Sequence, residues 1–489
     1  MRSAYDADTI RTAEQPLLDS LPDGTLMERA SYALARRCAE ILSPLYGSRV
    51  VLLVGSGGNG GDAMYAGARL ARRGARVDAL LLTDKPLARA LVALLEAGGR
   101  TTQAGGAVDA DLLGAADLVI DGMVGIGAAG ALREPMSRIV ELLEDGPAVV
   151  VAVDVPSGID ASTGVVEGAA VRADVTVTFG AIKAGLLIDP GAEYAGLVEH
   201  VDIGLDLPEP TITALDAADV AALLPAPSAE SDKYRRGVIG IVAGSDGYPG
   251  AALMSVGGAL GTGPGMVRFI GSYGPAHVVR LRWPEAVVTQ IDAGDADAMR
   301  AAGRVQAWVV GPGLGTGPDA KALVEAALDS DLPLVLDADA LTILATDSAI
   351  LHGRTAATLL TPHAGELARL SGRQREWIEA NRLTAAREAA RMLGVTVLLK
   401  GSTTLVAEPD GAVRVNTAST PYLATAGSGD VLSGVCGALL AGGLNALDAG
   451  SAGAFLHGLA GLIAAGDPAA PITAVDVLDS ISEAIRLTR

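Results

Sequence analysis

Short, continuously apolar segments alternate along the chain with longer segments in which apolar residues recur at helical spacing. A continuous apolar segment of this kind is typical of a strand that is buried on both faces of a parallel sheet. In the first half of the chain these segments are RVVLLVG (49–55), RVDALLLTD (76–84), ADLVIDG (116–122), PAVVVAVDVP (147–156) and ADVTVTFG (173–180). Because helical segments separate them, the pattern predicts an α/β fold with a doubly wound parallel sheet.

The strand pattern stops between residues 205 and 230, where prolines, acidic residues and small residues dominate. It starts again at GVIGIVAGS (237–245), and apolar helices follow from residue 430 to the end. Further strands are expected in AWVVGPGLG (307–315), LPLVLDADA (332–340), AATLLTPHAGE (356–366) and the segment 395–416. We therefore predict two α/β domains, at residues 1–213 and 231–489, joined by a linker at 214–230.

The net charge of −20 argues against one broad class of partner, because an acidic surface repels phosphate backbones. We expect no nucleic-acid partner. A ligand that is itself a phosphate ester needs local compensation from helix N-termini, a cation or a few basic side chains. Three of the five lysines, Lys183, Lys233 and Lys400, fall in the motifs described below.

No segment predicts a membrane anchor or a disulfide framework, and the charged start predicts no signal peptide. The most apolar segments, 431–444 and 452–466, are short and rich in Gly and Ala, which is typical of buried core helices. Cys38 and Cys436 lie far apart in apolar helical patterns, which fits buried thiols in a reducing compartment. We expect a cytoplasmic protein without a membrane partner, and its many small residues favour a homo-oligomer.

The glycine-rich segment GSGGNGGD (55–62) follows a predicted strand and opens a predicted helix. Backbone N–H groups of such a turn, together with the helix N-terminus, favour a phosphate group. The segment lacks the Lys-Ser/Thr of a P-loop but fits G-x-G-x-x-G at Gly55, Gly57 and Gly60. The pattern leaves two interpretations open, a dinucleotide site and a turn that serves tight packing.

Polar residues also follow the neighbouring strands. Asn59, Asp121 and Ser157 offer amide, carboxylate and hydroxyl oxygens, which are the ligands of hard cations. Asp154 and Lys183, in DVPSGID and TFGAIKAG, could form a proton donor–acceptor pair. The alternatives are a turn-capping role for Asp154 and a solvated surface position for Lys183.

In the second half, TAGSGD (425–430) precedes an apolar helix, and its N–H groups could hold a phosphoryl group during transfer. Asp430 stands where it could take a proton from an attacking hydroxyl, or it could simply cap the helix. KGSTT (400–404) offers a lysine and three hydroxyls to a nucleotide, and His363 lies in the loop TPHAGE. VVGPGLG (309–315) supplies another loop at a strand end.

The first-half motifs GSGGNGGD, DGMVGIG, DVPSGID and TFGAIKAG resemble the N-terminal domain of proteins that repair NAD(P)HX, the hydrated forms of NADH and NADPH. The resemblance implies a Rossmann-like fold, an epimerase, and a potassium ion held by Asn59, Asp121 and Ser157. We expect the donor–acceptor pair described above, Asp154 and Lys183, to be the catalytic residues of that epimerase. The resemblance also implies that NAD(P)HX contacts Gly58, Asn59, Gly60, Gly61, Asp62, Gly125, Ile126, Gly127, Ala128, Ala129, Gly130, Ala131 and Asp154. The chain departs from the family's Asn-Asn-Gly-Gly-Asp-Gly at Gly58 and Ala63.

The second-half motifs, with KYRRGVIGIVAGSDGYPGAALMS (233–255), resemble the ADP-dependent NAD(P)HX dehydratase, which has a ribokinase-like fold. The resemblance implies that ADP with Mg²⁺ phosphorylates the hydrate, that Asp430 is catalytic, and that AMP and phosphate are released. NAD(P)HX would contact Ala251, Gly313, His363 and Asp430; the nucleotide would contact Lys400, Gly401, Ser402, Thr403, Thr404 and Gly429. Small departures are Ser231-Asp232 before Lys233 and the segment GTGPGMV (261–267).

Three other functions remain open at this point. A ribokinase-type small-molecule kinase fused to a Rossmann-like ligand-binding domain would share the glycine–aspartate helix start. A non-catalytic binding module would share the first-half fold, and a dehydrogenase would share its glycine pattern. TPHAGE and KGSTT favour the dehydratase over the kinase, and the charge of −20 with Asn59, Asp121 and Ser157 present argues against a scaffold.

Overall fold

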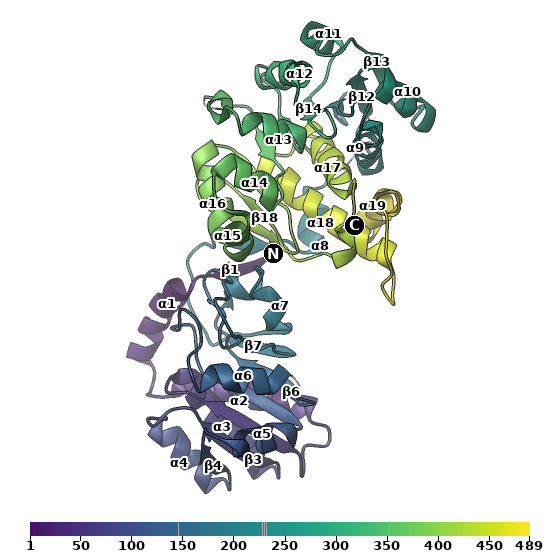
Figure 1. Ribbon diagram of the computed structural model, residues 1–489. Coiled ribbons are helices and arrows are strands. Elements are labelled where there is room, and N and C mark those ends of the chain that lie inside the picture. Colours follow the sequence, from purple (N-terminus) through teal and green to yellow (C-terminus); the bar gives the residue numbers. More distant parts are fainter. Residues whose placement is uncertain (145, 227, 229, 231, 352) are drawn as a thin grey trace. The chain divides into compact units, whose positions relative to one another are not determined.

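The computed structural model describes residues 1–489 except 145, 227, 229, 231 and 352 (Figure 1). The chain divides into an N-terminal unit, Ser3–Thr211, and a C-terminal unit formed by Met1–Arg2 and Ile212–Arg489. The division falls close to the predicted domain boundaries, which stay a prediction.

The N-terminal unit is built on a parallel sheet in the order β4-β3-β2-β5-β6-β7-β9. Its strands are β2 (Arg49–Val54), β3 (Arg76–Leu81), β4 (Arg100–Gln103), β5 (Leu118–Gly122), β6 (Val149–Val153), β7 (Val175–Phe179) and β9 (Leu197–Val201). The chain runs outward from β2 to β4 and then returns to the other side of β2 with β5. The reversal between β2 and β5 is the switch point at which doubly wound sheets bind ligands.

Alternation along the strands explains the layers of this unit. Val50, Leu52 and Val54 of β2 pack with the helices α2 (Thr25–Ile41), α3 (Gly58–Arg72) and α4 (Ala88–Glu96) on one face. Val51 and Leu53 pack with α5 (Ala107–Gly114) and α6 (Met136–Glu144) on the other. Successive side chains of a strand point to opposite faces, so a continuous apolar strand needs both layers.

Further short elements complete the N-terminal unit. Strand β1 (Arg2–Tyr5) pairs in parallel with β8 (Ile182–Lys183), and α1 (Ala7–Ser20) follows β1. Helix α7 (Ala192–Ala195) precedes β9. The sequence pattern predicts neither β1 nor α1.

The C-terminal unit has a larger sheet in the order β13-β12-β11-β14-β15-β16-β17-β18-β19-β10. Its strands are β10 (Ile212–Ala214), β11 (Val238–Val242), β12 (Met266–Gly271), β13 (Val287–Gln290), β14 (Ala307–Val310), β15 (Leu334–Leu336), β16 (Thr358–Leu360), β17 (Thr396–Leu399), β18 (Thr404–Ala407) and β19 (Val413–Asn416). Neighbouring strands pair in parallel from β13 to β17. The β17–β18 and β18–β19 pairs are antiparallel, and β19 pairs in parallel with β10.

Helices cover this second sheet. They are α8 (Ala217–Leu223), α9 (Pro249–Thr262), α10 (Tyr273–Arg282), α11 (Ala296–Ala301), α12 (Pro318–Leu328), α13 (Asp339–Leu344), α14 (Ala364–Ser371), α15 (Arg375–Ala380), α16 (Arg382–Leu393), α17 (Ser428–Ala441), α18 (Ala446–Ala465) and α19 (Ala474–Thr488). One core joins Ile239, Val309 and Leu398 of the sheet to α9, α17, α18 and α19. Figure 1 shows α9, α17 and α18 close together in this unit.

The structure bears on the predicted linker, on the predicted core helices and on the two cysteines. The predicted linker 214–230 contains helix α8, which is capped by Asp216 and buries Val220 in the core. Residues 227 and 229 of the linker, and residue 231 at the predicted start of the second domain, lie outside the described residues. Within the described chain, α18 is the one helix long and apolar enough to cross a membrane, but 67% of that window is buried inside the protein. Both cysteines are buried and free, as predicted.

Candidate active sites

The first site lies where β2, β5 and β6 end. The glycine turn follows β2, Asp121 lies in β5, and Asp154 and Ser157 follow β6. These strands are neighbours in the sheet, so their carboxyl ends meet at one edge.

Glycines are required in the turn after β2 because the backbone approaches other backbone closely. A Cβ added to Gly55 would lie 1.7 Å from the carbonyl oxygen of Met123, and one added to Gly60 would lie 2.4 Å from that of Gly55. The turn leads into the N-terminus of α3, whose N–H groups favour an anion. A Cβ at Gly58 would meet nothing within 4 Å, so packing does not require glycine there.

The three predicted cation ligands come together. The Ser157 hydroxyl donates to Oδ1 of Asp121 at 2.7 Å, and the Ser157 backbone N–H donates to Oδ2 at 2.7 Å. Asn59 donates from Nδ2 to the carbonyl oxygens of Val124 and Val153, at 3.0 and 2.5 Å. No hydrogen bond from the described residues reaches its Oδ1.

Burial raises the pKa of Asp121 to about 6, against hydrogen bonds from Ser157 and Met123 that lower it. A nearby cation would favour the ionised carboxylate, because an opposite charge offsets the cost of burying it. Carboxylate, hydroxyl and amide oxygens form a donor set that suits a hard cation, so these residues fit the predicted ion.

Asp154 and Lys183 form a buried ion pair. The two side chains are 10% and 1% exposed, and Nζ of Lys183 also donates to the Phe179 carbonyl oxygen at 2.8 Å and to Oγ1 of Thr178 at 3.1 Å. The backbone of Asp154 has φ = 68°, a conformation that a non-glycine residue adopts at some cost and that recurs at functional sites. The surface interpretation of Lys183 is therefore wrong.

A cavity of about 1420 Å³ opens at this edge of the sheet. Of the predicted substrate contacts, it is lined by Gly58, Asn59, Asp62, Gly125, Ile126, Gly127, Ala128 and Asp154. Gly60 and Gly61 instead pack against Gly55, Leu87 and Met27. Ala129 and Gly130 line a separate, small cavity, and Ala131 lines neither.

Helix α1 contributes charged side chains that the sequence analysis missed. Glu14 and Arg11 line the cavity, and Arg11 donates to the Ile126 carbonyl oxygen at 3.0 Å. Burial, and then Asp154, raises the pKa of Glu14, while Lys183 and Arg11 oppose the shift. The order of apolar residues in this helix gives no sign that it closes a site formed by distant strands.

The second site is built in the same way at the carboxyl ends of β15, β16 and β17. The residues that follow these strands are Asp337, the loop of His363, and Lys400. The N-terminus of α17 reaches the same place from the end of the chain, as the contacts below show. Parallel pairing of the three strands explains why residues far apart in sequence meet here.

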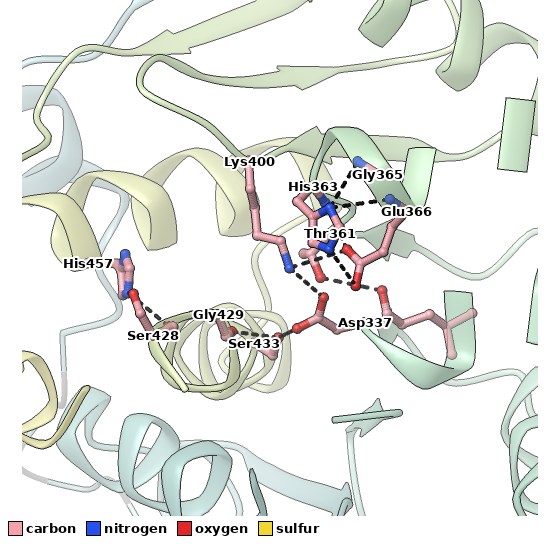
Figure 2. A network of polar contacts seen from close by, with 11 residues as sticks. Asp337, Thr361, His363, Gly365, Glu366, Lys400, Ser428, Gly429, Ser433 and His457 are labelled. Atoms are coloured by element: carbon pink, nitrogen blue, oxygen red, sulfur yellow. Dashed lines mark hydrogen bonds and ion pairs between the residues drawn. The ribbon is translucent and has the colours of Figure 1, made fainter. Parts of the chain in front are cut away.

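A polar network joins these elements (Figure 2). Nζ of Lys400 lies 2.8 Å from Oδ1 of the buried Asp337 and 3.7 Å from Oε2 of Glu366. The Ser433 hydroxyl, on α17, donates to Oδ2 of Asp337 and lies 3.0 Å from the Gly429 carbonyl oxygen. Asp337 therefore connects the predicted nucleotide lysine to the first turns of α17.

Asp430 lies in the first turn of α17, whose N-cap is Gly427, so it is not the helix cap. Burial raises the pKa of Asp430 to about 7, and Asp337 adds to the shift while Lys400 opposes it. Gly429 lies next to the lysine, because a Cβ added there would be 3.4 Å from Nζ of Lys400. An aspartate at a helix N-terminus, with an ammonium group beside it, can take a proton while a phosphoryl group is held.

His363 caps α14 rather than standing free in its loop. Its Nδ1 accepts hydrogen bonds from the N–H groups of Gly365 and Glu366, at 2.9 and 3.3 Å, and Glu366 accepts from the His363 backbone N–H at 2.8 Å. Burial lowers the pKa of His363, so the neutral ring is favoured. The side chain is still 56% exposed, although its Nε2 lies 3.5 Å from Oε1 of Glu366.

The KGSTT segment forms the turn between β17 and β18, and Arg382 of α16 holds it. Nη2 of Arg382 donates to the carbonyl oxygens of Lys400 and Thr403 at 3.0 and 2.9 Å. A Cβ added to Gly401 would lie 2.2 Å from that nitrogen, which explains the glycine. Gly401 and Ser402 are exposed, whereas Thr403 is buried.

The two remaining predicted contacts, Ala251 and Gly313, lie side by side. A Cβ added to Gly313 would be 2.7 Å from that of Ala251, and φ is +61° at this glycine. The loop that carries Gly313 is joined to the segment that carries Asp337, because the Gly315 N–H donates a hydrogen bond to Oδ2 of Asp339. The backbone of Ala338, between these aspartates, has φ = 51°.

Five residues of this site escaped the sequence analysis: Asp337, Glu366, Arg382, Ser433 and His457. Nε2 of His457 lies 3.0 Å from both Oγ and the carbonyl oxygen of Ser428, at the start of α17 (Figure 2). Asp337 stands at the end of a predicted strand, in LVLDADA. An aspartate at a strand end is the signal that identified Asp121, so the sequence could have revealed Asp337 as well. Ser433 and His457 lie inside apolar helices, where the sequence gives no such signal.

Comparison with known proteins identifies the family of each half of the chain. Residues 23–185 match the family described as YjeF-related protein N-terminus, and residues 239–483 match the family described as NAD(P)H-hydrate dehydratase. The chain is 48% identical over 447 residues to the bifunctional NAD(P)H-hydrate repair enzyme Nnr of Mycobacterium tuberculosis, covering 90% of this chain and 89% of that protein.

Solved structures match the C-terminal unit. The ADP/ATP-dependent NAD(P)H-hydrate dehydratase of Bacillus subtilis, co-crystallised with ATP and Mg²⁺, is 29% identical with a TM-score of 0.53, over 57% of this chain and 99% of that one. A ribokinase-like superfamily protein of Enterococcus faecalis, 22% identical with a TM-score of 0.52 over 58% and 98% of the chains, shares the fold. The predicted Rossmann-like and ribokinase-like folds are confirmed, and the chain belongs to the family of bifunctional NAD(P)H-hydrate repair enzymes.

Proposed function

We propose that the chain repairs hydrated nicotinamide cofactors, with an epimerase in the N-terminal unit and a dehydratase in the C-terminal unit. The epimerase interconverts the R and S forms of NAD(P)HX, and the dehydratase returns the S form to NAD(P)H with ADP and Mg²⁺. The observation that carries the proposal is the position of Asp430 in the first turn of α17, beside Lys400 and Asp337. Neither a binding module nor a dehydrogenase accounts for this arrangement.

In the dehydratase, Asp430 takes the proton of the substrate hydroxyl as that oxygen attacks the β-phosphorus of ADP. AMP departs, and the phosphorylated hydrate loses phosphate to restore the ring double bond. A hydroxyl leaves poorly and a phosphate leaves well, which explains why a dehydration uses a kinase fold. The α17 N-terminus stabilises the phosphoryl group, and the turn held by Arg382 positions Lys400 toward the nucleotide.

In the epimerase, the α3 N-terminus and the turn Gly125–Ala128 hold the phosphates of the cofactor, while the hydrated ring enters the cavity beside Asp154. Gly60 and Gly61 shape the turn after β2, and neither they nor Ala129, Gly130 and Ala131 line this cavity. A homo-oligomer and a cytoplasmic location remain predictions.

The potassium ion of the epimerase is part of this proposal, with Asn59, Asp121 and Ser157 as its ligands. When bound, the ion would supply charge that fixes the ends of β2, β5 and β6. We expect Asp121→Ala to remove the potassium dependence of epimerisation, because the only carboxylate of the proposed site is lost. Rates in potassium and in tetramethylammonium chloride at equal ionic strength measure this, and an unchanged dependence would place the ion elsewhere.

The glycine at position 58 makes a second prediction about the epimerase. The family usually has asparagine here, and a side chain at this position meets open space beside the cavity. We expect Gly58→Asn to fold normally and to lower the KM for NAD(P)HX several-fold by adding a hydrogen-bonding amide. Gly60→Asn is the matched control, and it should unfold the turn because a Cβ there collides with Gly55.

The function itself is tested by the recovery of reduced-nicotinamide absorbance from an equal mixture of R- and S-NADHX. Recovery that requires ADP and Mg²⁺ supports the dehydratase, and recovery beyond half of the substrate supports the epimerase. No recovery, with phosphate transferred stably to another acceptor, would favour the small-molecule kinase instead.

A further inference from the structure

One buried carboxyl oxygen in the N-terminal cavity has no hydrogen-bond partner within the part of the chain that the structure describes. Asp62, on α3, is 8% exposed and lines the cavity. Its Oδ1 is buried without a hydrogen bond from any described residue. A buried polar oxygen left unpaired is costly, so its retention calls for a functional explanation.

Charged groups from several elements line the cavity together with Asp62, among them Asp23, Glu28 and Arg89. Glu14 and Arg11 belong to α1, Asp154 follows β6, and Lys183 of β8 holds Asp154. Burial, followed by Asp154 and Glu14, raises the pKa of Asp62 well above its ordinary value. The surroundings therefore favour the protonated, donating form of this carboxyl.

Asp154 has the opposite environment in the same cavity. Its Oδ1 receives the Lys183 ammonium group and, at 3.0 Å, the backbone N–H of Phe179. No hydrogen bond from the described residues reaches its Oδ2, which leaves that oxygen available to a substrate. Two carboxyls that line one cavity, one buried with an unpaired oxygen and the other held by an ammonium group, form an arrangement that enzymes use for paired acid–base catalysis.

We propose that Asp62 is the second catalytic residue of the epimerase, donating a proton to the departing hydroxyl while Asp154 accepts one from the incoming solvent water. The inference rests on the proposed epimerase function. It gives Asp62 a chemical role that differs from simple substrate binding and explains why a side chain without a partner is kept in the cavity.

The step balances without any oxidant or reductant. The hydroxyl of the hydrate stands on a carbon bonded to the ring nitrogen. As Asp62 protonates that oxygen, the C–O bond breaks, the nitrogen lone pair forms a C=N bond, and water departs. Water then adds to the carbon from the opposite face, its proton passes to Asp154, and the C=N electron pair returns to nitrogen.

The two carboxyls have then exchanged protonation states, which is the state required for the reverse reaction. Proton exchange with solvent returns the enzyme to its starting state. Since the oxygen of the product comes from water, the mechanism leaves an isotopic record that substrate binding alone would not produce.

The test uses the full-length chain with R-NADHX and no ADP, in water enriched in heavy oxygen. We expect the S epimer to carry the heavy isotope, and we expect Asp62→Asn to lower the epimerisation kcat by about 10²–10⁴-fold, the usual contribution of a general acid. Asp62→Glu should recover part of the rate and keep the fall in kcat/KM at high pH, which the residual activity of Asp62→Asn should lack. Asp111→Asn, the same change on the exposed surface of α5, should match the wild type.

The outcomes separate this inference from the function on which it rests. A normal rate for Asp62→Asn, or light oxygen in the product, would overturn the role of Asp62 while the epimerase stands. Failure of the wild type to epimerise, with intact dehydration of S-NADHX by ADP, would instead remove the epimerase function and this inference with it. Normal dehydration of S-NADHX by Asp62→Asn shows that its defect is local to the N-terminal unit.

Discussion

Replacing Asp430 by asparagine should abolish dehydration while nucleotide binding persists. We expect Asp430→Asn to lower the kcat for S-NADHX by about 10²–10⁴-fold, because the variant cannot take the substrate proton. The backbone N–H groups of α17 and the turn that carries Lys400 are unchanged, so the Kd for ADP with Mg²⁺, measured by calorimetry, should stay at the wild-type value.

The pH profile of the wild type gives the same prediction a second readout. Burial raises the pKa of Asp430 to about 7, with Asp337 adding to the shift, so the carboxylate that acts as base forms only above that pH. We expect kcat/KM for dehydration to fall about tenfold per pH unit below this value, since the protonated form is inactive. The kcat/KM for epimerisation by the N-terminal unit should not show this decrease at low pH.

Stability separates a lost base from a damaged fold. A carboxyl whose pKa rises on folding stabilises the native state while it is protonated in both states, and that contribution is lost as the pH rises through the native pKa. Asparagine cannot ionise, so Asp430→Asn should unfold at an equal or higher temperature than the wild type at pH about 8. Asp479→Asn, on the exposed surface of α19, is the matched control. Wild-type turnover in Asp430→Asn would exclude Asp430 as the base.

The sequence predicts five strands of the N-terminal sheet, β2, β3, β5, β6 and β7, because each is a mostly apolar segment, but it misses β4 and β9. It also predicts the site, since strand order alone brings Asn59, Asp121, Asp154 and Ser157 to one edge. It misses α1 and with it Glu14. A polar helix near the chain start has no local pattern that reveals which distant cavity it covers.

In the C-terminal unit, too, the sequence reveals features that depend on local pattern and misses those that depend on contacts between distant elements. The predicted strands at 332–340 and 356–366 end earlier, at Leu336 and Leu360, because helices α13 and α14 begin within those segments. Strands β12 and β13 are missed. Asp430 and Lys400 are found from motifs, but Arg382 and Ser433 acquire their roles only through contacts between helices and turns.

Removing the ammonium group of the Lys183–Asp154 ion pair is expected to cause the largest loss of stability in the N-terminal unit. We expect Lys183→Met to destabilise this unit by about 3–5 kcal/mol, because the Asp154 carboxylate would remain buried without its ammonium partner. Circular dichroism of the full-length chain should show an earlier transition. Tryptophan fluorescence should not, since all three Trp residues, Trp283, Trp308 and Trp377, lie in the C-terminal unit.

The double variant Lys183→Met with Asp154→Asn separates the structural role of the pair from its catalytic one. Removing both charges should restore much of the stability lost in Lys183→Met, because no unpaired charge stays buried. Epimerisation should remain absent in the double variant, since the base is gone, while dehydration of S-NADHX by the other unit continues. If Lys183→Met instead unfolds like the wild type, the pair contributes nothing to folding; if the double variant epimerises, Asp154 is not the base.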